Sequence, residues 1–252
     1  MGMTFSTRLA TAALVVAMSS MVAAQTVDEI ITKSIAAVGG RAALQKIKSR
    51  RVTGTITLGT PGGNIDGTVE IVYAAPNKSR SLITADLSAL GAGTLTLDQR
   101  FDGSAGYILD SLQGNREMTG NQLDNMRNGS FPHPFLNYKE LGFSAKLEGK
   151  DKVGDRDAYV IVFEPATGST VRQYIDAETF LPIQSKVKIE VPQLGSDVEQ
   201  TVLLSDYRDV DGVKIPFLMK VSSTVQNYTV VTTKVEHNVP IDEKLFAKPA
   251  AP

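Results

Sequence analysis

Apolar and polar side chains alternate with a period of two along much of this chain, and this feature constrains its fold most. The alternation is clearest in residues 183–191 (IQSKVKIEV) and 215–221 (IPFLMKV), and it starts as early as residues 52–58 (VTGTITL). A period of two places successive side chains on opposite faces of a β-strand. Many short strands separated by turns at even spacing are typical of an antiparallel barrel or sandwich. The sequence therefore predicts a mainly β protein.

Two helices are expected before the strands. Thr26 and Glu29 have the spacing of a capping box, and apolar residues follow at helical spacing as far as Val38. The pair Gly39–Gly40 ends that helix, and residues 41–48 predict a second, shorter one. Strands are expected at residues 52–58, 65–73, 79–85, 94–101, 106–109, 158–164, 170–175, 183–191, 215–221 and 228–235, with a hairpin turn at Asp211–Gly212.

One segment interrupts the strands. Residues 119–129 (TGNQLDNMRNG) are polar and helix-like, and they lead into residues 131–136 (FPHPFL), which are apolar but too rich in proline for a central strand. Such an insert forms either a lid over one face of the sheet or a packing element at the end of a barrel. Its candidate lid residues are Leu123, Met126, Phe131, Phe135 and Leu136.

Residues 1–24 have the pattern of a cleavable export signal. Arg8 is followed by a short apolar run that breaks at Ser19–Ser20, and small residues precede Gln25. A membrane-spanning helix would need about 20 apolar residues. Because no cysteine follows the apolar run, a lipid anchor is not expected. The sequence predicts one exported domain, residues 25–252, outside the cytoplasm.

Composition excludes several kinds of chemistry. The chain has no cysteine, two histidines (His133 and His237), and 26 basic against 27 acidic residues. This rules out thiolate nucleophiles and Cys-ligated metals, and a net charge of -1 gives no basis for binding nucleic acid. Residues 103–106 (GSAG) lack the spacing of a nucleophile elbow, and the aspartates of residues 206–211 lack that of a calcium loop. We expect neither an enzyme nor a cofactor.

The order of several short motifs resembles the periplasmic LolA-like outer-membrane lipoprotein-sorting proteins, in a divergent branch. The matching stretches are residues 26–38, 75–80 (APNKSR), 101–107 (FDGSAGY), 174–183 (YIDAETFLPI), 206–216 (DYRDVDGVKIP) and 238–246 (NVPIDEKLF). The resemblance implies a curved antiparallel half-barrel whose apolar concave face is covered by helices. In the family an arginine before the Pro-Asn step helps to latch the lid, and here that position is Ala75.

The resemblance implies a carrier that shields acyl chains in an apolar groove during transfer to the outer membrane. Its partners would be an acyl lipid or lipoprotein, with an inner-membrane exporter or outer-membrane receptor on its route, and the protein would be a monomer. An envelope sensor with the same fold is the alternative, followed by a hydrolase with an unmarked site. The groove candidates, which could equally form an ordinary core, are Val52, Ile56, Val187, Ile189, Phe217 and Met219.

Overall fold

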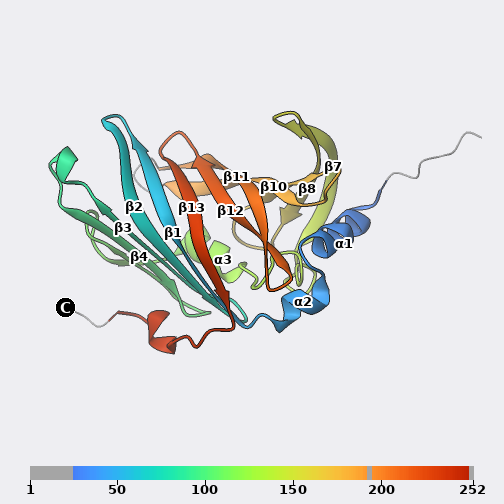
Figure 1. The fold of residues 1–252 in the computed structure, drawn as a ribbon, viewed down its shortest axis with the longest axis horizontal. Helices are drawn as coiled ribbons and strands as arrows, with labels where there is room; N and C mark the ends of the chain where they lie inside the picture. The colour runs from blue at the N-terminus through green and yellow to red at the C-terminus, as the bar shows by residue number, and fades with distance from the viewer. Residues whose placement is uncertain (1–24, 192–194, 250–252) are drawn as a thin grey trace, which may run out of the picture.

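The computed structural model describes residues 25–191 and 195–249, so the predicted export signal lies outside the described residues. The described strands form one antiparallel sheet (Figure 1). They are β1 Ser49–Thr60, β2 Gly63–Ala74, β3 Lys78–Asp86, β4 Thr94–Phe101, β5 Gly106–Asp110, β6 Arg116–Glu117, β7 Ser144–Val153, β8 Arg156–Glu164, β9 Val171–Asp176, β10 Pro182–Val191, β11 Ser196–Val210, β12 Val213–Ser222 and β13 Asn227–His237. The helices are α1 Val27–Ala37, α2 Arg41–Lys46 and α3 Gly120–Arg127, with 3-10 turns η1 Ser88–Leu90 and η3 Glu243–Leu245.

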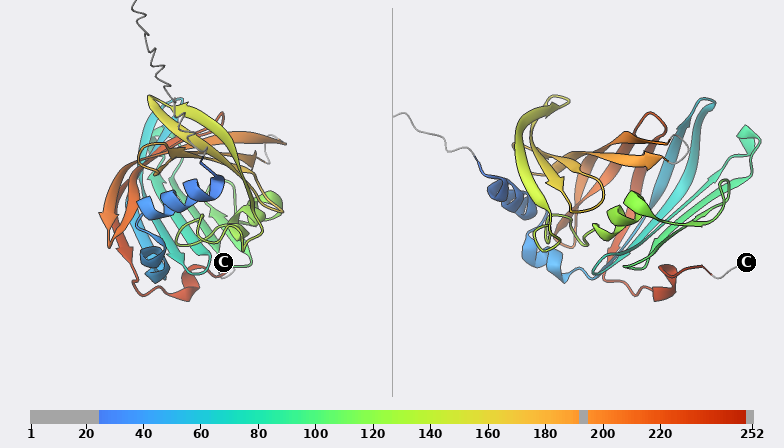
Figure 2. Two further views of the ribbon diagram at one scale, coloured as in Figure 1. Left: turned by 90° about the vertical axis from the view of Figure 1, so that its right-hand side faces the viewer. Right: turned by 180° about the vertical axis from the view of Figure 1, so that it is seen from behind.

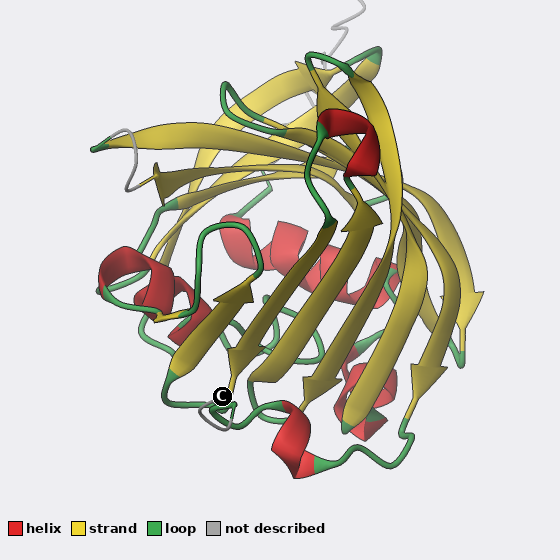
Figure 3. Cartoon of the chain, turned by 90° about the vertical axis from the view of Figure 1, so that its left-hand side faces the viewer, coloured by secondary structure: helices red, strands yellow, loops and turns green. Residues whose placement is uncertain are grey.

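The two edge strands of the sheet are consecutive in the sequence. The strand order runs β6-β5-β4-β3-β2-β1-β13-β12-β11-β10-β9-β8-β7, so β1 pairs with β13 in the middle and β6 and β7 are the edges. The sheet curves into an open half-barrel (Figures 2 and 3). Because β6 and β7 are consecutive along the chain, residues 118–143 must cross from one edge to the other. They do so on the concave side, and α3 lies in this crossing.

Register shifts accompany the curvature of the sheet. Pairing shifts between Thr53 and Gly54 in β1 against β13, and again in β7 and β10. Such bulges bend a strand and increase its twist. At Gly54 a β-carbon would lie 2.3 Å from the carbonyl oxygen of Val231, so only glycine permits this approach of two backbones.

Helix α1 packs beside β7, and both α1 and α2 contribute buried side chains to the main core. The capping box is confirmed, because Thr26 Oγ1 accepts from the backbone N–H of Glu29 at 3.3 Å and Glu29 Oε2 accepts from that of Thr26 at 2.9 Å. Ile30 and Ile31 of α1 are buried, and each such side chain contributes about 1.5–3 kcal/mol. The core that they join also contains Ile35, Val38, Leu44, Ile47, Phe131, Phe135, Leu136, Tyr138, Ile161, Phe163, Ile175, Val213, Ile215 and Phe217.

The predicted fold class is confirmed: the sheet is an incompletely closed antiparallel half-barrel with an N-terminal helix and a short helical insert. The second helix ends at Lys46, two residues earlier than predicted, because Ile47 already has an extended backbone. Strands β6, β7 and β11 were not among the predicted strands. Strand β7 is an edge strand with charged residues at half of its positions, so its sequence shows only a weak apolar alternation.

Candidate functional site

The concave face is only partly filled by the core. Beyond the core, α3 and the segment that follows it divide the remaining space into two cavities of about 480 and 400 Å³. Asn125, Gly129 and Pro134 line both cavities, so this segment forms the partition between them. Each volume lies within the ~300–1,000 Å³ typical of small-molecule sites.

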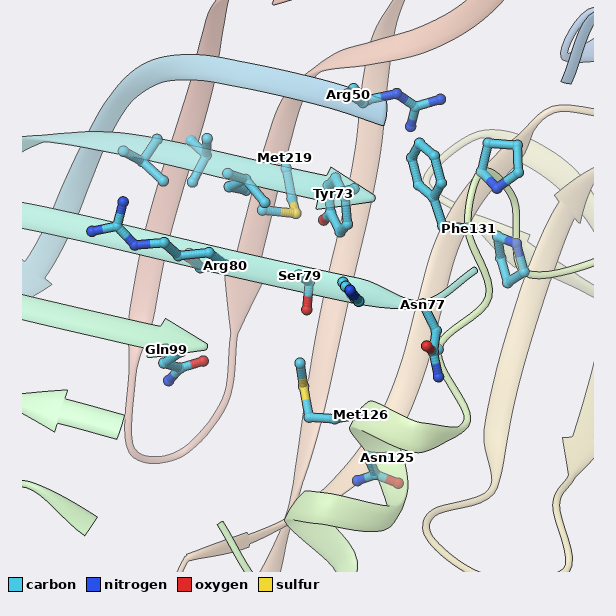
Figure 4. A pocket seen from close by; sticks show the side chains of 18 of the residues that line it. Arg50, Tyr73, Asn77, Ser79, Arg80, Gln99, Asn125, Met126, Phe131 and Met219 are labelled. Atoms are coloured by element: carbon cyan, nitrogen blue, oxygen red, sulfur yellow. The ribbon is translucent and has the colours of Figure 1, made fainter. Parts of the chain in front are cut away.

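The first cavity, of about 480 Å³, has an apolar floor built by the middle of the sheet. Apolar side chains from five strands and the polar Gln99 of β4 point into it, because they occupy the alternate positions of their strands that face the cavity (Figure 4). Met126 of α3 and Phe131 of the following segment lie across this floor. The apolar floor consists of Ile56, Val69, Ile71, Ile83, Met219, Tyr228 and Val230.

The second cavity, of about 400 Å³, lies on the other side of α3 against β8, β9 and β10. Val171 of β9 and Val187 and Ile189 of β10 line its floor. Phe135 and Phe143 line it from the segment between α3 and β7. Both cavities are therefore apolar hollows on the same concave surface.

Helix α3 is held across the concavity by polar contacts at both sides. Asn125 and Ser169 exchange two hydrogen bonds, of 3.0 Å from Asn125 Nδ2 to Ser169 Oγ and 2.8 Å from the Ser169 N–H to Asn125 Oδ1. Asn128 Nδ2 donates to a carbonyl of the same β8–β9 loop at 2.7 Å. On the opposite side, Arg127 donates to the carbonyl of Ser104, in the β4–β5 turn, at 3.1 Å. No residue of α3 is buried, so the helix bridges the opening without becoming part of the core.

Most of the residues predicted for the groove line these cavities. Ile56, Met126, Phe131 and Met219 line the first cavity, and Phe135, Val187 and Ile189 line the second. The other four do not line either one. Leu136 and Phe217 are buried in the core below α1 and α2, Leu123 lies half-buried on α3, and Val52 faces the concave side opposite Ile71.

Arg50 is the principal residue of the site that the sequence did not single out. It lines the first cavity from β1, and burial lowers the pKa of its guanidinium to about 10. Its Nε donates to Nε2 of His237 at 3.0 Å, and its guanidinium carbon lies 5.4 Å from the centroid of the Phe131 ring. Arg50 lies on the same face of β1 as Val52 and Ile56, because the three residues are separated by even numbers of positions. This period-two pattern could have identified Arg50 as a residue that faces the groove.

His133 lies beside Arg50 in the segment after α3. Its Nδ1 accepts a hydrogen bond of 3.3 Å from the backbone N–H of Phe135, and the two rings meet edge to face at 4.9 Å. Burial, followed by the positive charge of Arg50, lowers the pKa of His133 to about 4. The imidazole is therefore neutral at pH 7.

A second charged cluster, of Arg80, Arg100, Asp98 and Glu70, lies on the face of the sheet opposite the first cavity and contains two positive and two negative charges. Arg80 donates to both carboxylate oxygens of Asp98 at 2.8 Å, and Arg100 also pairs with Asp98 at 2.8 Å. Burial raises the pKa of Asp98, but hydrogen bonds from the two arginines outweigh it and hold this pKa below its ordinary value. The cluster serves to join β3 to β4.

Two further observations bear on the kind of site. Within residues 25–191 and 195–249, no group of three His, Asp or Glu side chains lies close enough together to hold a metal ion. In the same residues, no helix has the length and apolar character needed to cross a bilayer.

Solved structures share this architecture, although no protein-family model and no curated protein matches the sequence. A LolA superfamily protein from Nitrosomonas europaea aligns over 89% of this chain and 99% of its own, at a TM-score of 0.55 and 14% identity. A DUF1329 family protein from Desulfovibrio piger aligns over 89% of this chain and 98% of its own, at a TM-score of 0.55 and 12% identity. A domain from Vibrio parahaemolyticus that is described as an outer membrane lipoprotein-sorting protein domain aligns over 86% of this chain and 94% of its own, at a TM-score of 0.51 and 13% identity. The chain therefore has the LolA-like fold that its sequence resemblance predicted, in a divergent sequence.

Proposed function

We propose that the protein is a periplasmic carrier that binds the acyl chains of a lipid or lipoprotein in its concave groove. The observation that carries this proposal is the unfilled apolar surface on both sides of α3, in cavities of about 480 and 400 Å³. The similarity to a domain described as outer membrane lipoprotein-sorting supports the same function. Export by residues 1–24 would bring the protein to the compartment where such cargo travels.

The hydrophobic effect supplies enough free energy for this function. Burial of a chain of about sixteen carbons at about 0.8 kcal/mol per methylene contributes roughly 12 kcal/mol. Association costs at least about 4 kcal/mol in lost translation and rotation. The difference leaves room for tight binding without any covalent step.

Helix α3 would act as the lid in this carrier. Its attachments to Ser169 and Ser104 are hydrogen bonds that water can replace. Each bond of the neutral Asn125 contributes about 0.5–1.5 kcal/mol net, and the bond from the charged Arg127 contributes about 1.5–3 kcal/mol. A bound acyl chain would displace α3 at a cost well below its own gain from burial. Loading and release would then depend on movement of this helix, and no bond of the cargo would be made or broken.

The first test is native purification of residues 25–252 from an envelope extract, followed by mass spectrometry of the bound molecules. We expect stoichiometric acyl lipid or lipoprotein. A protein that purifies empty and also fails to bind an apolar fluorescent probe would refute the carrier. A stoichiometric membrane protein in place of lipid would favour the envelope sensor.

Filling each cavity tests its location. Ser81→Trp places a large ring in the first cavity, and Ser185→Trp does the same in the second. Thr84→Trp and Lys186→Trp are matched controls, because each lies on the opposite face of the same strand. We expect probe binding to fall severalfold in the cavity variants and to stay unchanged in the controls. Equal effects in all four would show that the probe binds elsewhere.

A further inference from the structure

The first cavity is lined by three cations and, among its described lining residues, by no carboxylate. The three are Arg50, Lys78 and Arg80. Only Arg50 points into the cavity, because Lys78 and Arg80 alternate along β3 with the cavity-facing Ser79 and Ser81. Lys78 forms an ion pair with Glu243, which lies outside the cavity lining, and Arg80 is paired at 2.8 Å with Asp98. Two of the three positive charges are thus already neutralised by the protein itself.

Arg50 is the third, and no carboxylate of the described chain forms an ion pair with it. Its Nη2 is buried and has no hydrogen-bond partner within those residues. Its Nε is satisfied only by the neutral ring nitrogen of His237, whose other nitrogen lies 3.2 Å from Asp211. The Asp211 side chain is 70% exposed and reaches Arg50 only through this imidazole. A buried charge without a counter-ion is costly, and an anion offered by a ligand would remove that cost.

The surroundings of Arg50 suit the polar end of an amphiphile. The guanidinium lies over Phe131, which in turn stacks on Tyr73 at 5.6 Å between ring centroids. Arg50 also lines a smaller adjoining cavity of about 190 Å³ together with His133. Figure 4 shows Arg50 at one end of the apolar floor of the first cavity, beside Phe131. A ligand lying along that floor would bring one of its ends to the guanidinium.

We propose that Arg50 binds the anionic end, a carboxylate or phosphate, of the amphiphile whose acyl chain occupies the first cavity. This inference rests on the proposed function and adds a headgroup class to it. The planar fork of an arginine matches two oxygens of either anion, and charge-assisted hydrogen bonds of this kind are stronger than neutral ones. An uncharged lipid of equal chain length would bury the same methylenes but leave Nη2 without a partner.

Three ligands of equal chain length and different headgroups separate the contribution of the headgroup to the binding affinity from that of the acyl chain. Hexadecanoate, hexadecyl phosphate and hexadecanol would each be titrated against a bound apolar fluorescent probe on residues 25–252. We expect at least one of the anions to bind about tenfold or more tightly than the alcohol, as a charge-assisted hydrogen bond predicts. Comparison of the two anions shows whether a fatty acid or a lipid phosphate is the better source. This measurement uses the unaltered protein, so it does not depend on the folding of any variant.

Variants then assign the preference to Arg50. Arg50→Gln should bind acid and alcohol equally, and Arg50→Lys should retain part of the preference. Arg51→Gln is the matched control, because Arg51 is the next residue of β1, faces the other side of the sheet and also has a buried nitrogen without a partner. Preference for the anion that survives Arg50→Gln would overturn the inference.

The outcomes separate this inference from the function on which it rests. If all three ligands bind the unaltered protein equally, the anion site is refuted and the acyl carrier stands. If none binds, both fail. The two histidines of the chain supply a second measurement, since the charge of Arg50 lowers the pKa of each. A bound anion should raise both pKa values in an NMR titration, and unchanged values at saturating hexadecanoate would contradict the proposed contact.

Discussion

The stability of the protein should fall as the pH is lowered from 6.5 to 4, and His133 should account for part of that loss. Its pKa is lowered from 6.5 to about 4 in the folded protein by burial and by the nearby charge of Arg50. Between these two pH values the unfolded chain binds one more proton at this site than the folded chain does. Stability therefore rises with pH across this window, by up to about 1.4 kcal/mol per pH unit. Integrated over the window, the contribution of His133 is about 3 kcal/mol.

The assay is urea unfolding at intervals between pH 4.5 and 7.5, compared with the variant His133→Asn. The Asn side-chain oxygen can still accept the hydrogen bond that the Phe135 N–H now donates to Nδ1, but it does not titrate. The carboxylates titrate in both proteins, so the difference between the two curves isolates His133. We expect the variant to lose about 2 kcal/mol less than the unaltered protein between pH 6.5 and 4.5. Parallel curves would refute the argument, because they would mean that His133 is protonated without cost in the folded state.

Three further predictions concern the stability of the sheet and the movement of α3. Asp176→Ala should lower the free energy of unfolding by about 3 kcal/mol in urea titrations, because this buried carboxylate accepts three hydrogen bonds from the turn that follows β9. Gly54→Ala should lower the free energy of unfolding by about 1–3 kcal/mol, because the added carbon would lie 2.3 Å from the carbonyl oxygen of Val231. Gly93→Ala is the control: its added carbon meets no atom within 4 Å, so the free energy of unfolding should be nearly unchanged. Asn125→Ala removes both hydrogen bonds between α3 and Ser169 and leaves the bond from Asn128 to the same β8–β9 loop, so stopped-flow measurements should show an apolar probe entering and leaving several times faster at a similar affinity. Unchanged rates would argue against α3 as the lid.

The sequence predicted the elements of the site better than their arrangement. Period-two alternation correctly placed Ile56, Met219 and Val187 on the concave face, because the direction of a side chain in a strand is a local property. The same alternation could not show which of these positions are packed by helices. Phe217 has the same pattern as Met219, yet it lies under the core formed with α1 and α2. That difference depends on contacts between segments far apart in the sequence.

Arg50 shows a second limit of the sequence. A charged residue at the start of a strand is ordinarily solvated, and its missing counter-ion becomes visible only when Glu243 and Asp98 are seen to pair with the other cations. The contact between Arg50 and His237 joins residues from β1 and β13, which pair only in the folded sheet. Sequence patterns give the side of the sheet that a residue faces, whereas its charge balance is a property of the whole fold.

The position of α3 follows from the topology of the sheet rather than from the sequence of the helix. Strands β6 and β7 are consecutive in the chain but lie at opposite edges of the sheet, so the segment between them has to cross the open side of the half-barrel. A polar helix in that crossing covers an apolar groove without filling it, because none of its residues is buried. Substitution of Leu123 or Met126 by aspartate should therefore leave the free energy of unfolding nearly unchanged. If Met126 contacts a bound chain, Met126→Asp should weaken acyl binding more than Leu123→Asp, because only Met126 lines the first cavity. Equal loss of binding and stability in both variants would instead make α3 a structural element of the fold.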